Sequence, residues 1–191
     1  MEHNYFESKI FENIDFRVNT FQIGEYENCT FNRCDFSNLN LSEIKFVECS
    51  FDNCNLSLAN ISSVVFNNIN FNNCKLFGLD FSKTNEFGLA FTFINCALNF
   101  SSFFGLKLKN TLFSNSQLNE VDFSQCDLTN SVFENCNLDR ATFAQTILAK
   151  VDLRSSSNYS IDPEKNSIKK AKFSLNEVVG LLSKYDIIIE R

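Results

Sequence analysis

Cysteine is the residue type in this chain with the most potential for chemistry, since eight cysteines and a single histidine, His3, occur in 191 residues. Zinc ribbons and fingers pair their thiolates at CxxC spacing, and oxidised secreted proteins pair them as disulfides. No two of these cysteines have CxxC spacing, and each lies two residues before a large apolar side chain. They are Cys29, Cys34, Cys49, Cys54, Cys74, Cys96, Cys126 and Cys136. Because free cysteine packs as a compact hydrophobe, we predict buried structural thiols in a reducing compartment.

Other catalytic or binding signals are missing from the sequence. There is no GxGxxG or P-loop motif, no histidine beyond His3, and no carboxylate pair that the pattern would hold in an apolar pocket. The absence of a basic and aromatic patch argues against direct nucleic-acid binding. We therefore predict a non-enzymatic protein without metal or cofactor.

The elements that position the cysteines follow a period of five residues. From Asn119 to Phe143 a large apolar residue recurs at every fifth place, and the series extends in both directions. Two registers, 6–81 and 93–153, hold 29 such central positions, filled by 17 Phe, 10 Leu, one Ile and one Tyr. Two residues before each central position stands a second inward position, which often carries Cys, Ala or Val. The remaining three residues of each unit are mostly polar.

A period of five matches neither the α-helix at 3.6 nor the β-strand at 2.0. It indicates a coil with sides five residues long, in which each unit buries its apolar side chains only against neighbouring coils. The expected fold class is therefore a solenoid.

Units such as Val121-Asp122-Phe123-Ser124-Gln125 resemble the pentapeptide-repeat family, whose consensus is a small residue, Asp or Asn, Leu or Phe, and two variable residues. The resemblance covers about four fifths of the chain. It implies an all-β fold, a right-handed quadrilateral β-helix with four units, hence twenty residues, per coil. Coils of twenty residues would place Cys34 under Cys54 and Cys54 under Cys74. Twenty-nine units then give a rod of a little over seven coils, roughly 34 Å long at the inter-strand spacing.

The pattern divides the chain into a β-helix over residues 1–153 and a C-terminal segment over residues 154–191. Between Phe81 and Phe93 the spacing is twelve rather than ten, so a two-residue register slip is expected within 82–92, near Gly88. A tolerated insertion and a functional loop both explain it, and the insertion is favoured.

The C-terminal segment has a different pattern. Ser174 and Glu177 form a capping-box pair, which predicts a short amphipathic helix over 175–184, and the β-branched run 186–190 predicts a terminal strand. So short a helix needs an apolar partner surface in water, which is the end of the solenoid, a partner chain, or both. We predict a homodimer whose interface consists of Val178, Leu181, Leu182, Ile187 and Ile189.

The tail also carries a more specific resemblance. Ile161-Asp162-Pro163, Asn166, Ala171, Phe173, Glu177, Leu181-Leu182 and Asp186-Ile187 resemble the tail of the gyrase-protecting quinolone-resistance (Qnr-type) branch. That resemblance implies end-to-end dimers that imitate duplex DNA in the DNA-binding saddle of a type II topoisomerase. The chain lacks the long loop that many plasmid-borne members insert in the first run, so topoisomerase binding is better supported than drug protection.

Negative charge is concentrated on the rod. Residues 1–153 hold 18 acidic and 10 basic side chains, a net of −8, whereas residues 154–191 hold 5 and 7, a net of +2. A 34 Å length of duplex carries about 20 charges, so any imitation of DNA must be limited to selected faces. The candidate partner-binding residues are Glu7, Glu25, Glu27, Glu48, Glu120, Glu134 and Asp139. An ordinary solvated surface explains these acids equally well.

Two functions remain. One is a DNA-mimicking binder of DNA gyrase or topoisomerase IV, and its binding either protects the enzyme from fluoroquinolones or natural gyrase poisons or inhibits it. The other is a pentapeptide-repeat scaffold with an unrelated protein partner. The N-terminal residues lack the basic start and apolar core of a secretory signal, and no apolar run approaches the roughly 20 residues of a membrane span, so a cytoplasmic location is expected.

Overall fold

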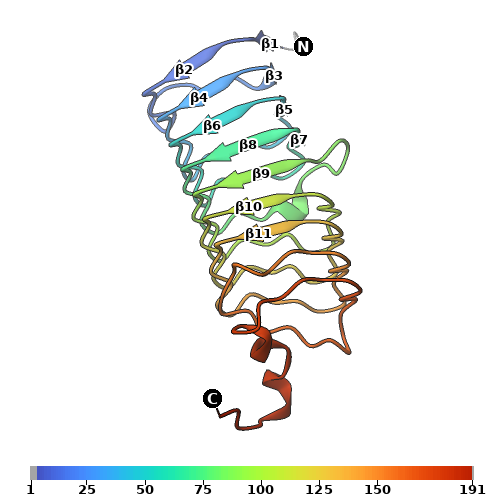
Figure 1. Ribbon diagram of the computed structural model, residues 1–191. Helices are drawn as coiled ribbons and strands as arrows, with labels where there is room; N and C mark the ends of the chain where they lie inside the picture. Colours follow the sequence, from blue (N-terminus) through green and yellow to red (C-terminus); the bar gives the residue numbers. More distant parts are fainter. Residues whose placement is uncertain (1–3, 191) are drawn as a thin grey trace.

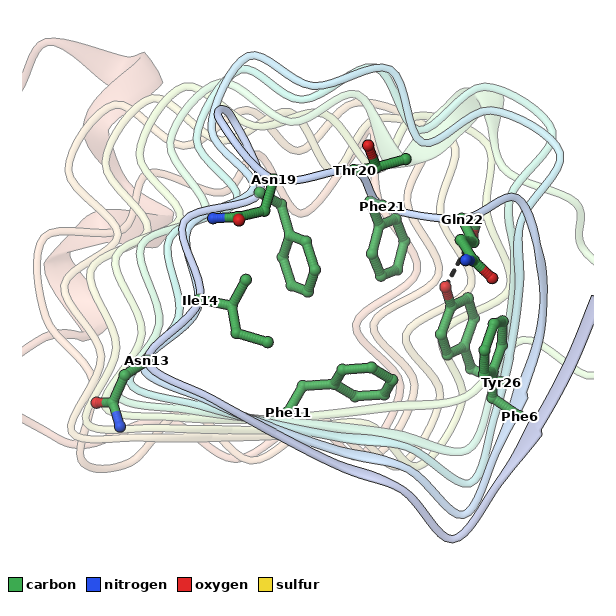
Figure 2. A pocket seen from close by; sticks show the side chains of 10 residues that line it. Phe6, Phe11, Asn13, Ile14, Asn19, Thr20, Phe21, Gln22 and Tyr26 are labelled. Carbon is green, nitrogen blue, oxygen red and sulfur yellow. Dashed lines mark hydrogen bonds between the residues drawn. The ribbon is translucent and has the colours of Figure 1, made fainter.

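The structure, a computed structural model, describes residues 4–190 and shows a rod of stacked coils with the two termini at opposite ends (Figure 1). Viewed along the rod, each coil has four sides (Figure 2). His3, the single histidine of the sequence, lies outside the described residues. The fold is an all-β parallel solenoid, as the five-residue period and the family resemblance together predict.

Two parallel sheets cover two adjacent sides, which we call side A and side B; the next two sides along the chain are side C and side D. Side A carries the sheet β1 (Asn4–Glu7), β3 (Gly24–Glu27), β5 (Lys45–Val47) and β7 (Val65–Asn67). Side B carries β2 (Ile10–Glu12), β4 (Thr30–Asn32), β6 (Ser50–Asp52), β8 (Ile69–Asn72), β9 (Phe91–Ile94), β10 (Leu112–Ser114) and β11 (Val132–Glu134). Sides C and D are linked by single bridges, such as Asp15 to Asp35 and Asn40 to Asn60.

Most five-residue units end with a residue in the left-handed region, and this turns the chain from one side to the next. Positive φ values, mostly between 50° and 65°, recur two residues after most central positions, and asparagine fills this place most often, as at Asn53 and Asn73. Asparagine tolerates this conformation better than most residues. The outward polar residues of the repeat are therefore needed to form the corners of the coil as well as to meet solvent.

The interior is a set of aromatic ladders that run the length of the rod. Phe113 is completely buried, and its ring stacks on Phe93 at 5.1 Å and on Phe133 at 4.7 Å between centroids. Rings on opposite sides of the coil meet edge to face in the interior, as Phe113 on side B and Phe123 on side D do at 5.7 Å. Aromatic pairs favour both geometries. A large residue at every fifth position thus packs upward, downward and sideways.

The predicted register slip is present as a two-residue insertion. Strand residues pair at intervals of twenty up to β8, but Ile69 pairs with Phe91, twenty-two residues on, and twenty returns from Thr92 to Leu112. The extra residues follow the 3₁₀ helix η1 (Phe81–Lys83) and form a loop beside β7 and β9 (Figure 1). Gly88 sits in this loop with φ of 67°.

The ladder continues past residue 153, the boundary expected from the sequence. Asn137 pairs with Ser157, Ile147 with Ser167, and Asp152 with Lys172. Ile168 and Phe173 hold central positions of these last units and pack against the core. The sequence pattern missed this coil because Asn158 and Pro163 replace the apolar residues at the two preceding central positions.

The C-terminal segment departs from the predicted helix and strand. Ser174 does cap a turn, since its hydroxyl accepts from the backbone N–H of Glu177 at 3.2 Å. The chain then forms two 3₁₀ helices, η2 (Val178–Leu181) and η3 (Ser183–Tyr185), in place of one α-helix. Residues 186–190 form no β-pairing with the described part of the chain. The reason for the difference is local docking: Gly180 lies so close to the last coil that its carbonyl accepts from Ile161 at 3.0 Å, and an added Cβ would meet the Tyr159 carbonyl oxygen at 2.1 Å.

Candidate functional site

Four of the seven candidate acids lie on the N-terminal half of side A. Glu7 on β1 pairs in register with Glu27 on β3, so two carboxylates are stacked in adjacent coils. Tyr5 donates a hydrogen bond to Glu27, and this bond raises the pKa of the Tyr5 hydroxyl to about 12. Glu25 is not free, because the Lys45 ammonium lies 3.4 Å from its carboxylate. Glu48 occupies the corner after β5 with φ of 53°.

The other three candidates lie on the C-terminal half, on different sides of the rod. Glu134 is on β11 of side B and accepts from the Ser114 hydroxyl at 2.9 Å. Glu120 and Asp139 belong to adjacent coils of side C, where the Glu120 N–H donates to the Asp139 carbonyl at 2.8 Å. Arg140 lies between their carboxylates, at 3.5 Å from Glu120 and 4.0 Å from Asp139.

The structure therefore brings four of the candidate acids, Glu7, Glu25, Glu27 and Glu48, together as one cluster on side A. Glu120 and Asp139 lie together on side C, and Glu134 lies on side B. Exposed ion pairs contribute at most about 1 kcal/mol, so the pairing cations can be drawn away by a competing partner. The cluster on side A and the pair on side C are partly neutralised negative patches that can meet a basic surface.

Further carboxylates are bound more tightly to neighbouring cations. Asp15 stacks beneath Asp35 as the sequence predicts, but Arg17 lies 2.7 Å from the first and 3.5 Å from the second. The hydrogen bond from Arg17 lowers the pKa of Asp15. Asp152 accepts from Arg154 at 2.7 Å, which lowers its pKa to about 2. Sequence reasoning found the Asp15 and Asp35 stack but missed the arginine two residues after each aspartate at positions 15 and 152.

The cysteines lie where the sequence places them, in the inward positions of the coil. All eight are buried. The Cys34 N–H donates to Cys54 Sγ at 3.4 Å, which confirms the predicted stacking of these two residues. Burial raises the pKa of Cys49 and of Cys126 to about 12, and that of Cys136 to about 11. Since the thiolate is the reactive form, little reactive thiolate forms at Cys49, Cys126 and Cys136 at neutral pH.

The residues predicted to form a dimer interface are partly exposed, so they are partly available for contact with a second chain. Leu181 packs partly against the core, and Val178 and Leu182 are half-buried. Ile187 is 55% exposed and Ile189 50% exposed. Sequence reasoning missed the contacts that dock this segment on the last coil: Lys184 lies 2.7 Å from both Asp162 and Glu164, and the Tyr185 hydroxyl donates to Glu164 at 3.0 Å.

An open hollow of about 520 Å³ lies at the N-terminal end of the rod (Figure 2). Phe11, Ile14 and Phe21 point into it, and the Tyr26 hydroxyl at its edge donates to the Gln22 carbonyl at 2.7 Å. The hollow exists because the first coil stacks on a second coil on one face only. Its walls are the end of the aromatic ladder and hold no cluster of charged or metal-ligating groups.

The described residues hold no group of three or more His, Cys, Asp or Glu arranged to bind a metal ion. Within the same part of the chain, the helices are too short and too polar to cross a lipid bilayer.

Comparison with protein families gives two matches. A family model described as a pentapeptide repeat region matches residues 24–91. A second family model, described as pentapeptide repeats in eight copies, matches residues 96–135. Together they cover 68 and 40 residues, or 108 of 191, which is more than half of the chain. No curated protein sequence matches the chain.

Solved structures share the fold at low sequence identity. A trypsin-treated variant of QnrB1, a plasmid-mediated fluoroquinolone resistance protein, matches with a TM-score of 0.71 at 15% identity, over 98% of this chain and 92% of that one. Full-length QnrB1 matches with a TM-score of 0.55 at 17% identity, over 96% and 100% of the two chains. HetL, a pentapeptide repeat protein involved in heterocyst differentiation regulation in the cyanobacterium Nostoc, has a TM-score of 0.42 at 15% identity, over 89% and 87%.

Proposed function

The chain belongs to the pentapeptide-repeat family, and from this premise we propose that it binds a bacterial type II topoisomerase, DNA gyrase or topoisomerase IV, at the DNA-binding surface. The observation that carries the proposal is the acid on the rod, in a cluster on side A and at three further positions on sides B and C. The likeness of the fold to QnrB1 over nearly the whole chain supports the choice of partner. The proposal includes a homodimer formed through Val178, Leu181, Leu182, Ile187 and Ile189, with Ile187 and Ile189 exposed for contact.

A rod with acidic patches can occupy a basic saddle because it presents negative charge at the spacing of stacked coils. Glu7 and Glu27 are separated by one coil, about 4.8 Å, which is comparable with the rise of about 3.4 Å per phosphate along one strand of duplex DNA. Opposite charges on the two surfaces speed encounter and fix orientation more than they add affinity. Occupation of the saddle would exclude DNA and so limit the damage done by a fluoroquinolone or a natural gyrase poison.

A cytoplasmic location is part of the proposal. Eight free and buried thiols in one chain fit a reducing compartment better than an oxidising one.

The charges of Glu120, Glu134 and Asp139 provide the test of topoisomerase binding. Reversing these three residues should weaken binding to purified gyrase, whereas reversing Lys83 and Lys107 should not, because only the acids supply negative potential. Arg140→Gln sharpens the test, because it frees Glu120 and Asp139 from their shared cation and should strengthen binding. Equal binding by all of these variants would refute the acidic surface.

A scaffold with an unrelated protein partner is the second candidate. It is favoured by the pairing of acids with cations on the rod itself, as between Glu25 and Lys45 at 3.4 Å and between Lys109 and Asp127 at 3.1 Å. Such pairs reduce the negative field that DNA mimicry needs. Capture of a partner other than a topoisomerase, with no effect of the acidic variants, would favour this function.

A further inference from the structure

Side A has opposite charges at its two ends. Its N-terminal half presents four acids and one base, a net of −3: Glu7, Glu25, Glu27, Glu48 and Lys45. Its C-terminal half presents five bases and one acid, a net of +4: Lys107, Lys109, Lys150, Lys169, Lys170 and Asp127. No single-sign face of this length exists here, so side A as a whole does not imitate DNA.

Both halves belong to the same side of the rod. The sheet of side B is continuous from β2 to β11, and each of its strands directly follows a unit of side A in the chain. Residues 64–68 precede β8, and residues 106–110 precede β10. Since β8, β9 and β10 pair in sequence, the units before them stack in the same order.

The insertion loop lies at the middle of this side. Four layers precede it, marked by Tyr5, Glu25, Lys45 and Val65. Four layers follow it, marked by Lys107, Asp127, Ile147 and Ser167. The loop is therefore the fifth of nine layers, and the change from acid to base occurs across it.

The middle of side A carries several apolar side chains and one exposed acid, Glu86. Phe87 in the insertion loop is 79% exposed, and Val47, Val65 and Leu89 around it are half-buried. Outward positions elsewhere in the repeat are mostly polar. An exposed aromatic residue among aliphatic neighbours marks a contact surface.

We propose that side A is a self-complementary interface on which a second copy of this chain lies antiparallel, related by a twofold axis through the layer of Phe87. A twofold contact requires a surface that complements itself, with each residue on one chain facing its counterpart in reversed order. Side A meets this requirement at its ends, where reversal sets acid against base, and at Phe87, which meets its own copy. The sixth layer, with Lys107 and Lys109, faces the fourth, with Val65, and Glu86 faces its own copy.

The reversed order also matches individual layers. The first layer, with Glu7, faces the ninth, with Lys169 and Lys170. The second layer, with Glu25 and Glu27, faces the eighth, whose following corner is Lys150. The two residues of the minority sign face each other as well: Lys45 is in the third layer and Asp127 in the seventh. Because Lys45 and Asp127 also face each other, the charge pattern of side A fits a second copy of this chain better than a different, negatively charged partner.

This lateral pair is separate from the proposed C-terminal dimer. It buries the acidic cluster of Glu7, Glu25, Glu27 and Glu48 and leaves Glu120, Glu134 and Asp139 open on sides B and C. Pairing and partner binding would then compete for the cluster on side A only. The inference does not depend on the identity of the partner.

Reversing the charges at either end of side A tests the lateral pair. The background carries Leu181→Glu and Leu182→Glu, which removes the C-terminal contact from the measurement. At low ionic strength this protein should sediment at twice the 21.9 kDa of one chain, and salt should dissociate it. Glu7→Lys with Glu27→Lys should give monomers, as should Lys150→Glu with Lys170→Glu. An equimolar mixture of the two variants should form a pair again, because each then complements the other.

A cysteine on the axis tests the geometry. Phe87→Cys should form an intermolecular disulfide readily, because a residue on a twofold axis meets its own copy. Phe104→Cys is the matched control, because this residue is 45% exposed but lies on side D. The native cysteines are buried and do not interfere. A monomer at low salt, a mixture of variants that does not associate, or equal crosslinking at both positions would overturn the proposal.

Discussion

The rod and its C-terminal segment are stabilised in different ways. In the rod, Phe113 is fully buried between two stacked rings, and the coils above and below repeat the arrangement. In the segment after Ser174, Leu175 is 89% and Ile188 90% exposed, and the chain is held by Gly180, Lys184 and Tyr185 against one coil. In the rod, each unit packs against copies of the same unit in the coils above and below. The segment after Ser174 depends instead on contacts that occur once in the molecule.

Phe113→Ala should have the largest effect on stability. It removes a ring from the middle of the ladder, and buried Phe→Ala changes cost about 3–5 kcal/mol. Ile188→Ala removes a side chain that is 90% exposed and should change stability by less than about 0.5 kcal/mol. Urea denaturation followed by circular dichroism measures both. Similar values for the two variants would contradict the account of the rod.

Leu181→Glu with Leu182→Glu should convert a C-terminal dimer into a monomer while the β-sheet signal is retained. Solenoid stability is mostly nearest-neighbour in origin, so a change beyond the last coil leaves the other coils intact. Sedimentation at moderate salt, where lateral pairing is screened, measures the mass. Ile23→Glu is the control, since Ile23 is 64% exposed on the rod. A wild-type monomer under these conditions would remove the dimer from the proposal.

The buried thiols should resist labelling in the folded protein. Reaction must wait for opening of the coils, and a stability of at least 5 kcal/mol slows it by about 1,000-fold or more relative to the unfolded chain. The raised pKa of Cys49, Cys126 and Cys136 adds to this protection, because less thiolate forms. Mass spectrometry after timed exposure to a thiol reagent gives the rates. Rapid native labelling of several cysteines would show that the coils open.

Acid should weaken the last coils by a smaller amount. The pKa of Asp152 is lowered to about 2 by Arg154, so its contribution is present above an ordinary aspartate pKa of about 4 and is lost as pH falls towards 2. The pair is partly exposed, and its contribution is at most about 1 kcal/mol. Asp152→Asn should flatten the dependence of stability on pH in this range. An unchanged pH profile would show that the ion pair does not stabilise the fold.

Much of the fold could be predicted from the sequence because the period of five is a property of consecutive residues. The central Phe and Leu positions, the inward cysteines and the insertion near Gly88 all follow from spacing alone. The extension of the ladder to Lys172 could not be predicted in this way, because Asn158 and Pro163 break the apolar series while the backbone continues its pairing.

The site was less predictable. The acids could be named from the sequence, but their cations could not, because Arg140 and Lys45 reach carboxylates twenty residues away across adjacent coils. The predicted helix over 175–184 failed for a similar reason. Its apolar spacing is compatible with a helix, but Gly180 and Lys184 make contacts with Tyr159, Ile161 and Asp162 that two short 3₁₀ helices satisfy better.

Competition between this protein and duplex DNA for a type II topoisomerase tests the central claim most directly. Purified gyrase would be titrated with the labelled protein at fixed ionic strength, alone and with increasing linear duplex. If the acidic patches occupy the DNA-binding surface, duplex should displace the protein, and added salt should weaken its binding, because exposed charges are screened over about 8 Å at physiological ionic strength. No binding, or binding that excess duplex leaves unchanged, would contradict the account.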